Sequence, residues 1–296
     1  MLVLLQGLVI AHLGQGIAVE YEGQVILCQT RRRLETVAVG DTVLWERTSA
    51  DAGRIEQLLP RRSVLLRPAR GNKTKPVAAN IDQLCIVFAI APLCDFLLLD
   101  QYLAVCENNQ LAAMLVLNKC DLADTEQLDS ALTDYVNLGY ILHRVTALAP
   151  NDAGFIELKQ AISNKVSIFT GQSGVGKSSL TNALIPDKAL KTNAISQTSK
   201  LGRHTTTAAT LYHLPEGGDI IDSPGVAIFG LAELSAAQLA YGYREFQPLL
   251  GQCRFNDCRH LHDKDCAIRA AAVCGQISMA RYQRFCKLLE KMALIA

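Results

Sequence analysis

The stretch with the clearest chemistry covers residues 171–178, which fit the phosphate-loop pattern G-x-x-x-x-G-K-S/T. The residues before it, 165–170, predict a buried strand, and those after it, 179–184, predict a helix. Glycines let such a loop surround a phosphate chain with backbone N–H groups, and the helix N-terminus adds a favourable dipole. A glycine-rich turn that binds no ligand is the alternative. The residues expected to bind a nucleotide here are Gly171, Gln172, Ser173, Gly174, Val175, Gly176, Lys177, Ser178 and Ser179.

Other residues predict chemistry at the phosphates. Lys177 can reach the β- and γ-phosphates, and Ser178 is placed to bind Mg²⁺. Asp222 and Gly225 follow a predicted strand and match D-x-x-G, in which Asp contacts Mg²⁺ through water and Gly senses the γ-phosphate. Residues 202–207, Gly-Arg-His-Thr-Thr-Thr, are a candidate first switch that offers a threonine to Mg²⁺.

A second motif predicts the base. Residues 112–117 read as a strand, and the N-K-x-D tetrapeptide that follows is typical of guanine recognition. The Asp carboxylate accepts hydrogen bonds from the base N1–H and N2–H₂, which adenine cannot offer, while Asn and Lys brace the base and the phosphate loop. Residues 145–147 end another strand and could form a further loop under the base. The tetrapeptide is Asn118, Lys119, Cys120 and Asp121.

The order of these motifs is informative. In Ras-like GTPases the phosphate loop comes first and N-K-x-D comes late, whereas here N-K-x-D precedes the phosphate loop by about fifty residues. One sheet can still bring the motifs together, because domain termini lie close and circular permutation is tolerated. The sequence therefore predicts a circularly permuted GTPase that binds GTP and GDP.

Beyond the predicted sheet, three cysteines and a histidine have the spacing of a metal site. Cys253, Cys258, His260 and Cys266 form a Cys₃His set suited to tetrahedral Zn²⁺, and His262 is the rival imidazole. A cluster of buried cysteines is the alternative. With no open position and no general base nearby, one structural Zn²⁺ per chain is expected, stabilising a tail too small to fold alone.

Composition sets the broad class. The 296 residues are 50% hydrophobic and 19% charged with net charge +1, which indicates two or three globular domains. Five of the ten cysteines are scattered, and the other five lie after residue 250 with three closely spaced, which predicts a metal site in a reducing compartment rather than a disulfide framework. No apolar run approaches the length of a membrane span. A cytoplasmic protein is expected, and residues 61–75, with six basic and no acidic residues, suit RNA contact or a solvated surface.

Short alternating runs predict the architecture around these motifs. Residues 1–68 read as about five strands of a small β-barrel of the OB-fold type, with Arg31, Arg32 and Arg33 in a connection where such barrels bind nucleic acid. Residues 67–72 read as a linker. Alternating strands and helices then predict a mostly parallel sheet over 69–230, followed by a mainly helical zinc-binding domain over 231–296.

Several features together indicate a known family: the barrel, the motifs N-K-C-D, G-Q-S-G-V-G-K-S-S, G-R-H-T-T-T and D-S-P-G, and the Cys₃His tail. With these features the chain resembles the RsgA (YjeQ) family of circularly permuted GTPases over nearly its whole length. The resemblance implies GTP hydrolysis coupled to late maturation of the 30S ribosomal subunit, with the barrel and zinc domain binding 16S rRNA, and we expect a monomer. A GTP-regulated RNA-binding module whose hydrolysis is incidental is the alternative. A metabolic GTP-dependent kinase or transferase would need an acceptor pocket and a base, and the sequence indicates neither.

The residue expected to orient the attacking water differs from that of Ras-like enzymes. Ras-like enzymes carry a Gln after D-x-x-G to orient the attacking water, but Val226 occupies that position. His204 in the candidate first switch is the best internal replacement, since an imidazole can orient or deprotonate water near neutral pH. We therefore expect His204, Lys177 and the Mg²⁺ ligand Thr206 to act in catalysis, with slow hydrolysis that the ribosome stimulates.

Overall fold

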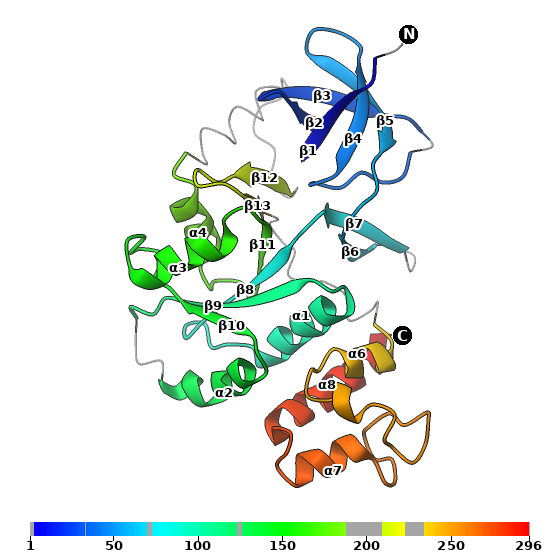
Figure 1. Ribbon diagram of the computed structural model, residues 1–296, viewed down its shortest axis with the longest axis vertical. Helices are drawn as coiled ribbons and strands as arrows, with labels where there is room; N and C mark the ends of the chain where they lie inside the picture. Colours follow the sequence, from blue (N-terminus) through cyan, green and yellow to red (C-terminus); the bar gives the residue numbers. More distant parts are fainter. Residues whose placement is uncertain are drawn as a thin grey trace.

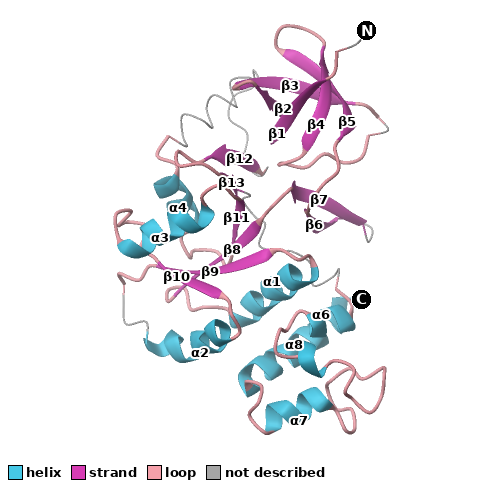
Figure 2. Cartoon of the chain, viewed as in Figure 1, coloured by secondary structure: helices cyan, strands magenta, loops and turns pink. Residues whose placement is uncertain are grey.

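The computed structural model describes residues 3–32, 34–69, 73–122, 126–187, 209–222 and 234–295. Three regions follow one another along the chain (Figure 1). Strands form the end that carries the N-terminus, a sheet with helices occupies the middle, and helices and loops form the other end (Figure 2). The prediction of a multidomain α/β protein with a terminal barrel is confirmed.

The N-terminal region is a closed five-stranded barrel of the OB-fold type. Its strand order is β1-β2-β3-β5-β4, and pairing of β4 with β1 closes the barrel. Apolar residues alternate along each strand, and the inward set surrounds Trp45, which is fully buried. The strands are β1 (Leu5–Leu13), β2 (Gly16–Tyr21), β3 (Gln24–Thr30), β4 (Thr42–Arg47) and β5 (Ala52–Leu58).

A pair of antiparallel strands follows the barrel, so the prediction of a linker over 67–72 was wrong for residues 67–69, which belong to a strand, while residues 70–72 lie outside the described residues. Strands β6 (Val64–Ala69) and β7 (Lys73–Ala79) pair antiparallel. The predicted boundary between residues 68 and 69 therefore cuts β6. In the sequence, Pro68 and Gly71 favour a linker, but Leu65 on β6 is buried in the main core and stabilises the strand.

The central sheet has the strand order β10-β9-β8-β11-β13-β12. Its first five strands run parallel and β12 is antiparallel. All seven residues of β8 are buried. Leu84, Ile86 and Phe88 pack on one face of the sheet with α1 and α2, and the residues between them pack on the other with α3 and α4. The elements are β8 (Gln83–Ala89), α1 (Phe96–Asn108), β9 (Ala112–Asn118), α2 (Glu126–Asn137), β10 (Ile141–Arg144), α3 (Ala153–Ile162), β11 (Val166–Thr170), α4 (Lys177–Leu184), β12 (Thr210–His213) and β13 (Asp219–Asp222).

The barrel and the central sheet are continuous. Strand β12 pairs antiparallel with β1 at Thr210 and Ala11, which produces one 11-stranded sheet. Beside this junction, the two ring nitrogens of His213 each lie 2.6 Å from a carboxylate oxygen, one of Asp219 on β13 and one of Glu20 on β2. These two partners raise the pKa of His213 to about 10. A charged imidazole therefore joins the two regions at neutral pH.

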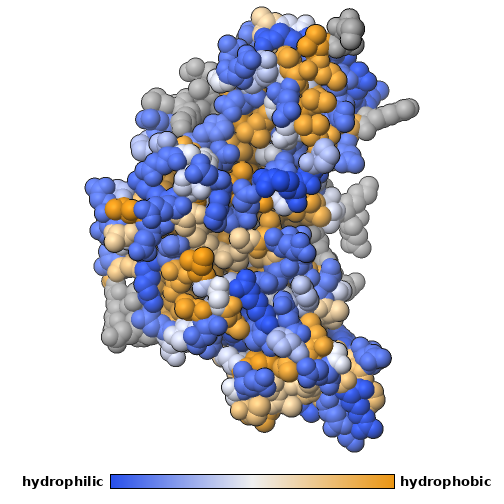
Figure 3. Space-filling model, in the orientation of Figure 1, coloured by the Kyte–Doolittle hydropathy of each residue, from blue (hydrophilic) through white to orange (hydrophobic). Residues whose placement is uncertain are grey.

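The C-terminal region is helical and has its own core. Tyr243, Phe246 and Phe285 pack ring against ring in its centre, all fully buried. Within the described part of the chain, no helix combines the length and the apolar character needed to span a membrane. On the face in Figure 3, hydrophobic residues lie in separate patches among hydrophilic ones. The elements are α6 (Ala236–Tyr241), the 3₁₀ helix η2 (Gln247–Leu249), α7 (Ala267–Val273) and α8 (Met279–Ile295).

Candidate nucleotide site and metal centre

The phosphate loop connects the end of β11 to the start of α4. Gly171 and Gly176 adopt φ angles of +134° and +93°, which side-chain-bearing residues rarely adopt. A Cβ on Gly171 would lie 1.9 Å from the carbonyl oxygen of Val87, so this glycine also lets the loop start pack against β8. Gly176 is the N-cap of α4, whose first residue is Lys177. The loop geometry is that of an anion cradle at a helix N-terminus.

Lys177 lies across this loop. Its Nζ donates hydrogen bonds of 2.7 Å to the carbonyl oxygens of Gly171 and Gln172. Burial lowers the pKa of Lys177, and the negative charge of Asp222 at the end of β13 acts in the opposite direction. Ser173, Gly174, Ser178 and Ser179 are exposed, so the outer surface of the loop is open to a ligand.

The N-K-x-D loop at the end of β9 is bound directly to the phosphate loop. Asn118 is buried, and its Nδ2 donates to the carbonyl oxygen of Val175 at 2.9 Å. Its Oδ1 accepts a hydrogen bond from the backbone N–H of Ala147 at 3.1 Å. Lys119 Nζ donates to the carbonyl oxygen of Gly174 at 2.7 Å. The N-K-x-D loop therefore contacts both the phosphate loop and the loop at residues 145–147. A permuted GTPase requires this, because its motifs must meet in space although their order in the sequence is changed.

The last two residues of the tetrapeptide lie at the rim of this junction. The backbone N–H of Cys120 donates to the carbonyl oxygen of Val145 at 3.3 Å. Burial raises the pKa of the Cys120 thiol. Asp121 is exposed, so its carboxylate is accessible to a base.

Three predicted site residues, His204, Thr206 and Gly225, lie outside the described residues. Two other groups near the loop were not predicted. Tyr102 on α1 is fully buried; burial raises the pKa of its hydroxyl, and Thr170 and Gly171 at the start of the phosphate loop act in the opposite direction. The carbonyl oxygen of Ala91 accepts a hydrogen bond from Lys119 Nζ at 2.8 Å. Both features depend on the tertiary fold, and no local motif in the sequence indicates them.

The Cys₃His set converges in the C-terminal region. One ligand atom from each of its four residues lies within 4.8 Å of the others. Nδ1 of His260 is 3.5 Å from Cys253 Sγ and 3.6 Å from Cys266 Sγ, and these two sulfurs are 3.9 Å apart. Tetrahedral Zn²⁺ with ordinary bond lengths requires about 3.6 Å between nitrogen and sulfur and about 3.8 Å between sulfurs. The four residues therefore fit a zinc ion, and the exposed His262 is outside the group.

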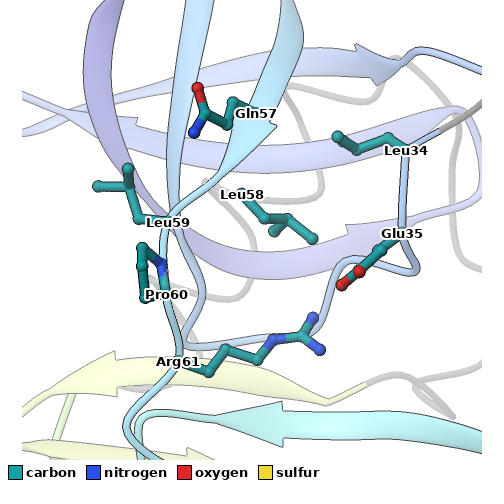
Figure 4. Close-up of a pocket in the computed structure, with 7 residues that line it drawn as sticks. All are labelled: Leu34, Glu35, Gln57, Leu58, Leu59, Pro60 and Arg61. Carbon is teal, nitrogen blue, oxygen red and sulfur yellow. The ribbon is translucent and has the colours of Figure 1, made fainter.

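A separate pocket of about 550 Å³ lies on the barrel and is lined mainly by residues at the end of β5 (Figure 4). Of its polar lining groups, Arg61 is already bound to the carboxylate of Asp41 and the carbonyl oxygen of Thr36. Glu35 and Gln57 remain, and these two side chains do not form a nucleophile–base pair. The pocket is distinct from the phosphate loop.

Comparison with known proteins agrees with this geometry. The RsgA GTPase family matches residues 58–232. A small ribosomal subunit biogenesis GTPase RsgA from Actinobacillus pleuropneumoniae serotype 5b is 42% identical, with 96% of this chain and 85% of the relative covered. RsgA 1 from Vibrio vulnificus strain YJ016 is 43% identical, with 97% and 84% covered.

Two crystal structures share the fold. YjeQ from Thermotoga maritima has a TM-score of 0.78 and 30% identity, with 98% of this chain and 99% of that chain covered. YloQ, described as a circularly permuted GTPase, has a TM-score of 0.76 at 24% identity, with 99% and 96% covered, and supports the fold alone. With a family match over more than half of its length and relatives above 40% identity along nearly all of it, the chain belongs to the RsgA GTPase family.

Proposed function

We propose that this GTPase binds the small (30S) ribosomal subunit and hydrolyses GTP during its maturation, as a cytoplasmic monomer that contacts 16S rRNA. The observation that carries the proposal is the junction at Asn118, which joins a guanine-type loop to a phosphate loop although the two are permuted in sequence. The names of the relatives, small ribosomal subunit biogenesis GTPases, support the ribosomal partner.

In this proposal each loop has one task. Asp121 accepts the hydrogen bonds of guanine, while Asn118 and Lys119 hold the base loop on the phosphate loop. The loop N–H groups bind the phosphates, and Lys177 exchanges its two carbonyl partners for phosphate oxygens. Bound Mg²⁺ would neutralise developing phosphate charge; Ser178 and Thr206 are the proposed ligands, Asp222 would reach it through water, and Gly225 would sense the γ-phosphate.

We also propose that His204 orients or deprotonates the attacking water. The proposal rests on the sequence, because the residue after D-x-x-G is Val226 and its side chain cannot position water. Slow hydrolysis by the free chain and a large increase on the ribosome are expected.

The proposed domains are the barrel, the permuted GTPase domain and a C-terminal domain stapled by Zn²⁺. The first boundary is best placed after β5 ends at Leu58, so that hairpin β6–β7 stays whole. Zinc would be held by Cys253, Cys258, His260 and Cys266 in a closed, structural site.

The test is GTP turnover with and without purified 30S subunits. Turnover should be slow in the free chain and should rise strongly with 30S subunits. Lys177→Ala should abolish it, and Lys159→Ala on helix α3 is the matched control that should not. In His204→Ala the stimulation should be lost while GTP binding remains. Equal turnover with and without 30S subunits would instead favour an RNA-binding module with incidental hydrolysis.

A further inference from the structure

Strand β13 ends at Asp222, the residue proposed to reach Mg²⁺ through water, and it lies between two strands with different roles (Figure 1). On one side it pairs parallel with β11, which leads directly into the phosphate loop. On the other side it pairs antiparallel with β12, where Thr210 lies opposite Asp222. Each of β12 and β13 has only four residues, so their pairing contains few backbone hydrogen bonds. The position of Asp222 therefore depends on how β12 is held.

The barrel holds β12 at its first residue. Ala11 on β1 pairs with Thr210, the same residue that lies opposite Asp222. In the described part of the chain this is the single residue pair between β1 and β12. The backbone thus links the barrel to Asp222 through Thr210, but one pair alone does not fix the register and direction of a strand.

A side-chain bridge holds the other end of β12. His213 is the last residue of that strand, and its Nε2 lies 2.6 Å from a carboxylate oxygen of Glu20 on the barrel strand β2. Its Nδ1 lies 2.6 Å from a carboxylate oxygen of Asp219, the first residue of β13. The bridge therefore extends from the second barrel strand to the strand that carries Asp222. With the Thr210 pair at one end and this bridge at the other, the barrel determines where β12 and β13 lie.

We propose that Glu20 of the barrel is a positioning residue for Asp222, acting through His213, and that the barrel thereby sets the Mg²⁺-dependent affinity for GTP. The inference rests on the proposed nucleotide site. It assigns the barrel a role inside the GTPase cycle that is separate from RNA contact. Because linkage between two binding sites is reciprocal, a partner that moves the barrel and lowers GTP affinity is itself bound more weakly, by the same factor, when GTP is present.

The first test is Glu20→Ala. The side chain of Glu20 is 26% exposed and that of His213 is 48% exposed, so the substitution leaves no buried charge without a partner. In excess Mg²⁺, the affinity for a fluorescent non-hydrolysable GTP analogue should fall about twofold to fivefold, the range expected when a partly exposed ion pair is lost. The loss should disappear when Mg²⁺ is chelated, because Asp222 acts on the nucleotide only through the metal and its water.

Glu56→Ala is the matched control. Glu56 also forms ion pairs with partly exposed partners, but both of them, Arg31 and Arg54, belong to the barrel. Its replacement should therefore leave the affinity for the analogue unchanged, with Mg²⁺ and without it. Amide hydrogen exchange in β12 and β13, measured without nucleotide, should become faster in Glu20→Ala and not in Glu56→Ala.

The second test repeats Glu20→Ala in a His213→Gln background, where it should cause no further loss of affinity. An equal loss in both backgrounds would show that Glu20 does not act through His213, and a loss that persists without Mg²⁺ would show that it does not act through Asp222. Either result, or unchanged affinity in Glu20→Ala, would overturn the inference while the nucleotide site stands. Failure of the unaltered chain to bind the GTP analogue would refute the proposed site and the inference with it.

Discussion

The junction at Asn118 allows a quantitative prediction. Asn118→Ala removes the hydrogen bonds to the Val175 carbonyl and the Ala147 N–H, both at a buried position. Each of the two partners left without a hydrogen bond costs about 1–3 kcal/mol, so the free energy of unfolding should fall by about 2–6 kcal/mol. The loss should appear without nucleotide, because the bonds lie within the protein.

A double-mutant cycle with Gly176 tests the packing of Asn118 against the phosphate loop. A Cβ there would lie 2.3 Å from Nδ2 of Asn118, and the φ of +93° adds strain of about 1–2 kcal/mol for any other residue. Gly176→Ala should therefore destabilise the chain through both strain and clash. In the Asn118→Ala background the clash is gone and only the strain remains. The double variant should be more stable than the sum of the single effects predicts, by at least about 1 kcal/mol.

Urea unfolding of the four nucleotide-free proteins measures this coupling. Single-variant effects that add to within about 0.5 kcal/mol would show that Asn118 and Gly176 do not share this packing, and the described junction would be refuted.

Three further predictions follow from other sites. Asp121→Asn should shift preference from GTP to xanthosine triphosphate, because the amide places a donor where guanine also has donors; unchanged GTP affinity would remove Asp121 from base recognition. Metal analysis should find one zinc per chain, lost in His260→Ala and kept in His262→Ala; the reverse result would move the imidazole ligand. Hydrogen bonds to Asp219 and Glu20 raise the pKa of His213 from 6.5 to about 10, so its stabilising charge is fully present below pH 6.5 and is lost as pH rises towards 10. The melting temperature of the unaltered chain should therefore fall more between pH 7 and 10 than that of His213→Gln. Parallel falls in the two proteins would show that the contacts of His213 with Asp219 and Glu20 do not stabilise the fold.

Much of the site could be predicted from sequence because its parts are local. A phosphate loop needs glycines at fixed positions, and the positive φ angles of Gly171 and Gly176 give the reason. The metal ligands lie within fourteen residues, so their spacing nearly determines their convergence. Alternation likewise predicted the barrel and the parallel sheet, and the strands predicted at residues 112–117 and 165–170 differ from β9 and β11 by one residue at one end.

The features that could not be predicted depend on contacts between distant residues. Pro68 and Gly71 indicate a linker when only the local sequence is considered. Burial of Leu65 in the core instead stabilises strand β6 and its pairing with β7. Asp100 and Arg281 are 181 residues apart, and nothing near either residue indicates a charged pair in the interior. Tyr102 is one apolar position among many in its helix, and only the packed fold shows that it is fully buried and that Thr170 and Gly171 influence the pKa of its hydroxyl.

The continuous sheet has a consequence for aggregation. Strand β12 ends the GTPase sheet, and the barrel strand β1 covers its outer edge at Thr210. A chain shortened to begin after the barrel would present that edge to solvent, with free N–H and C=O groups ready to pair with another molecule. It would also leave Asp219 and His213 without Glu20. The barrel strand thus covers an edge that could otherwise pair with a second molecule, and removal of the barrel should make edge-to-edge association of the GTPase part more favourable.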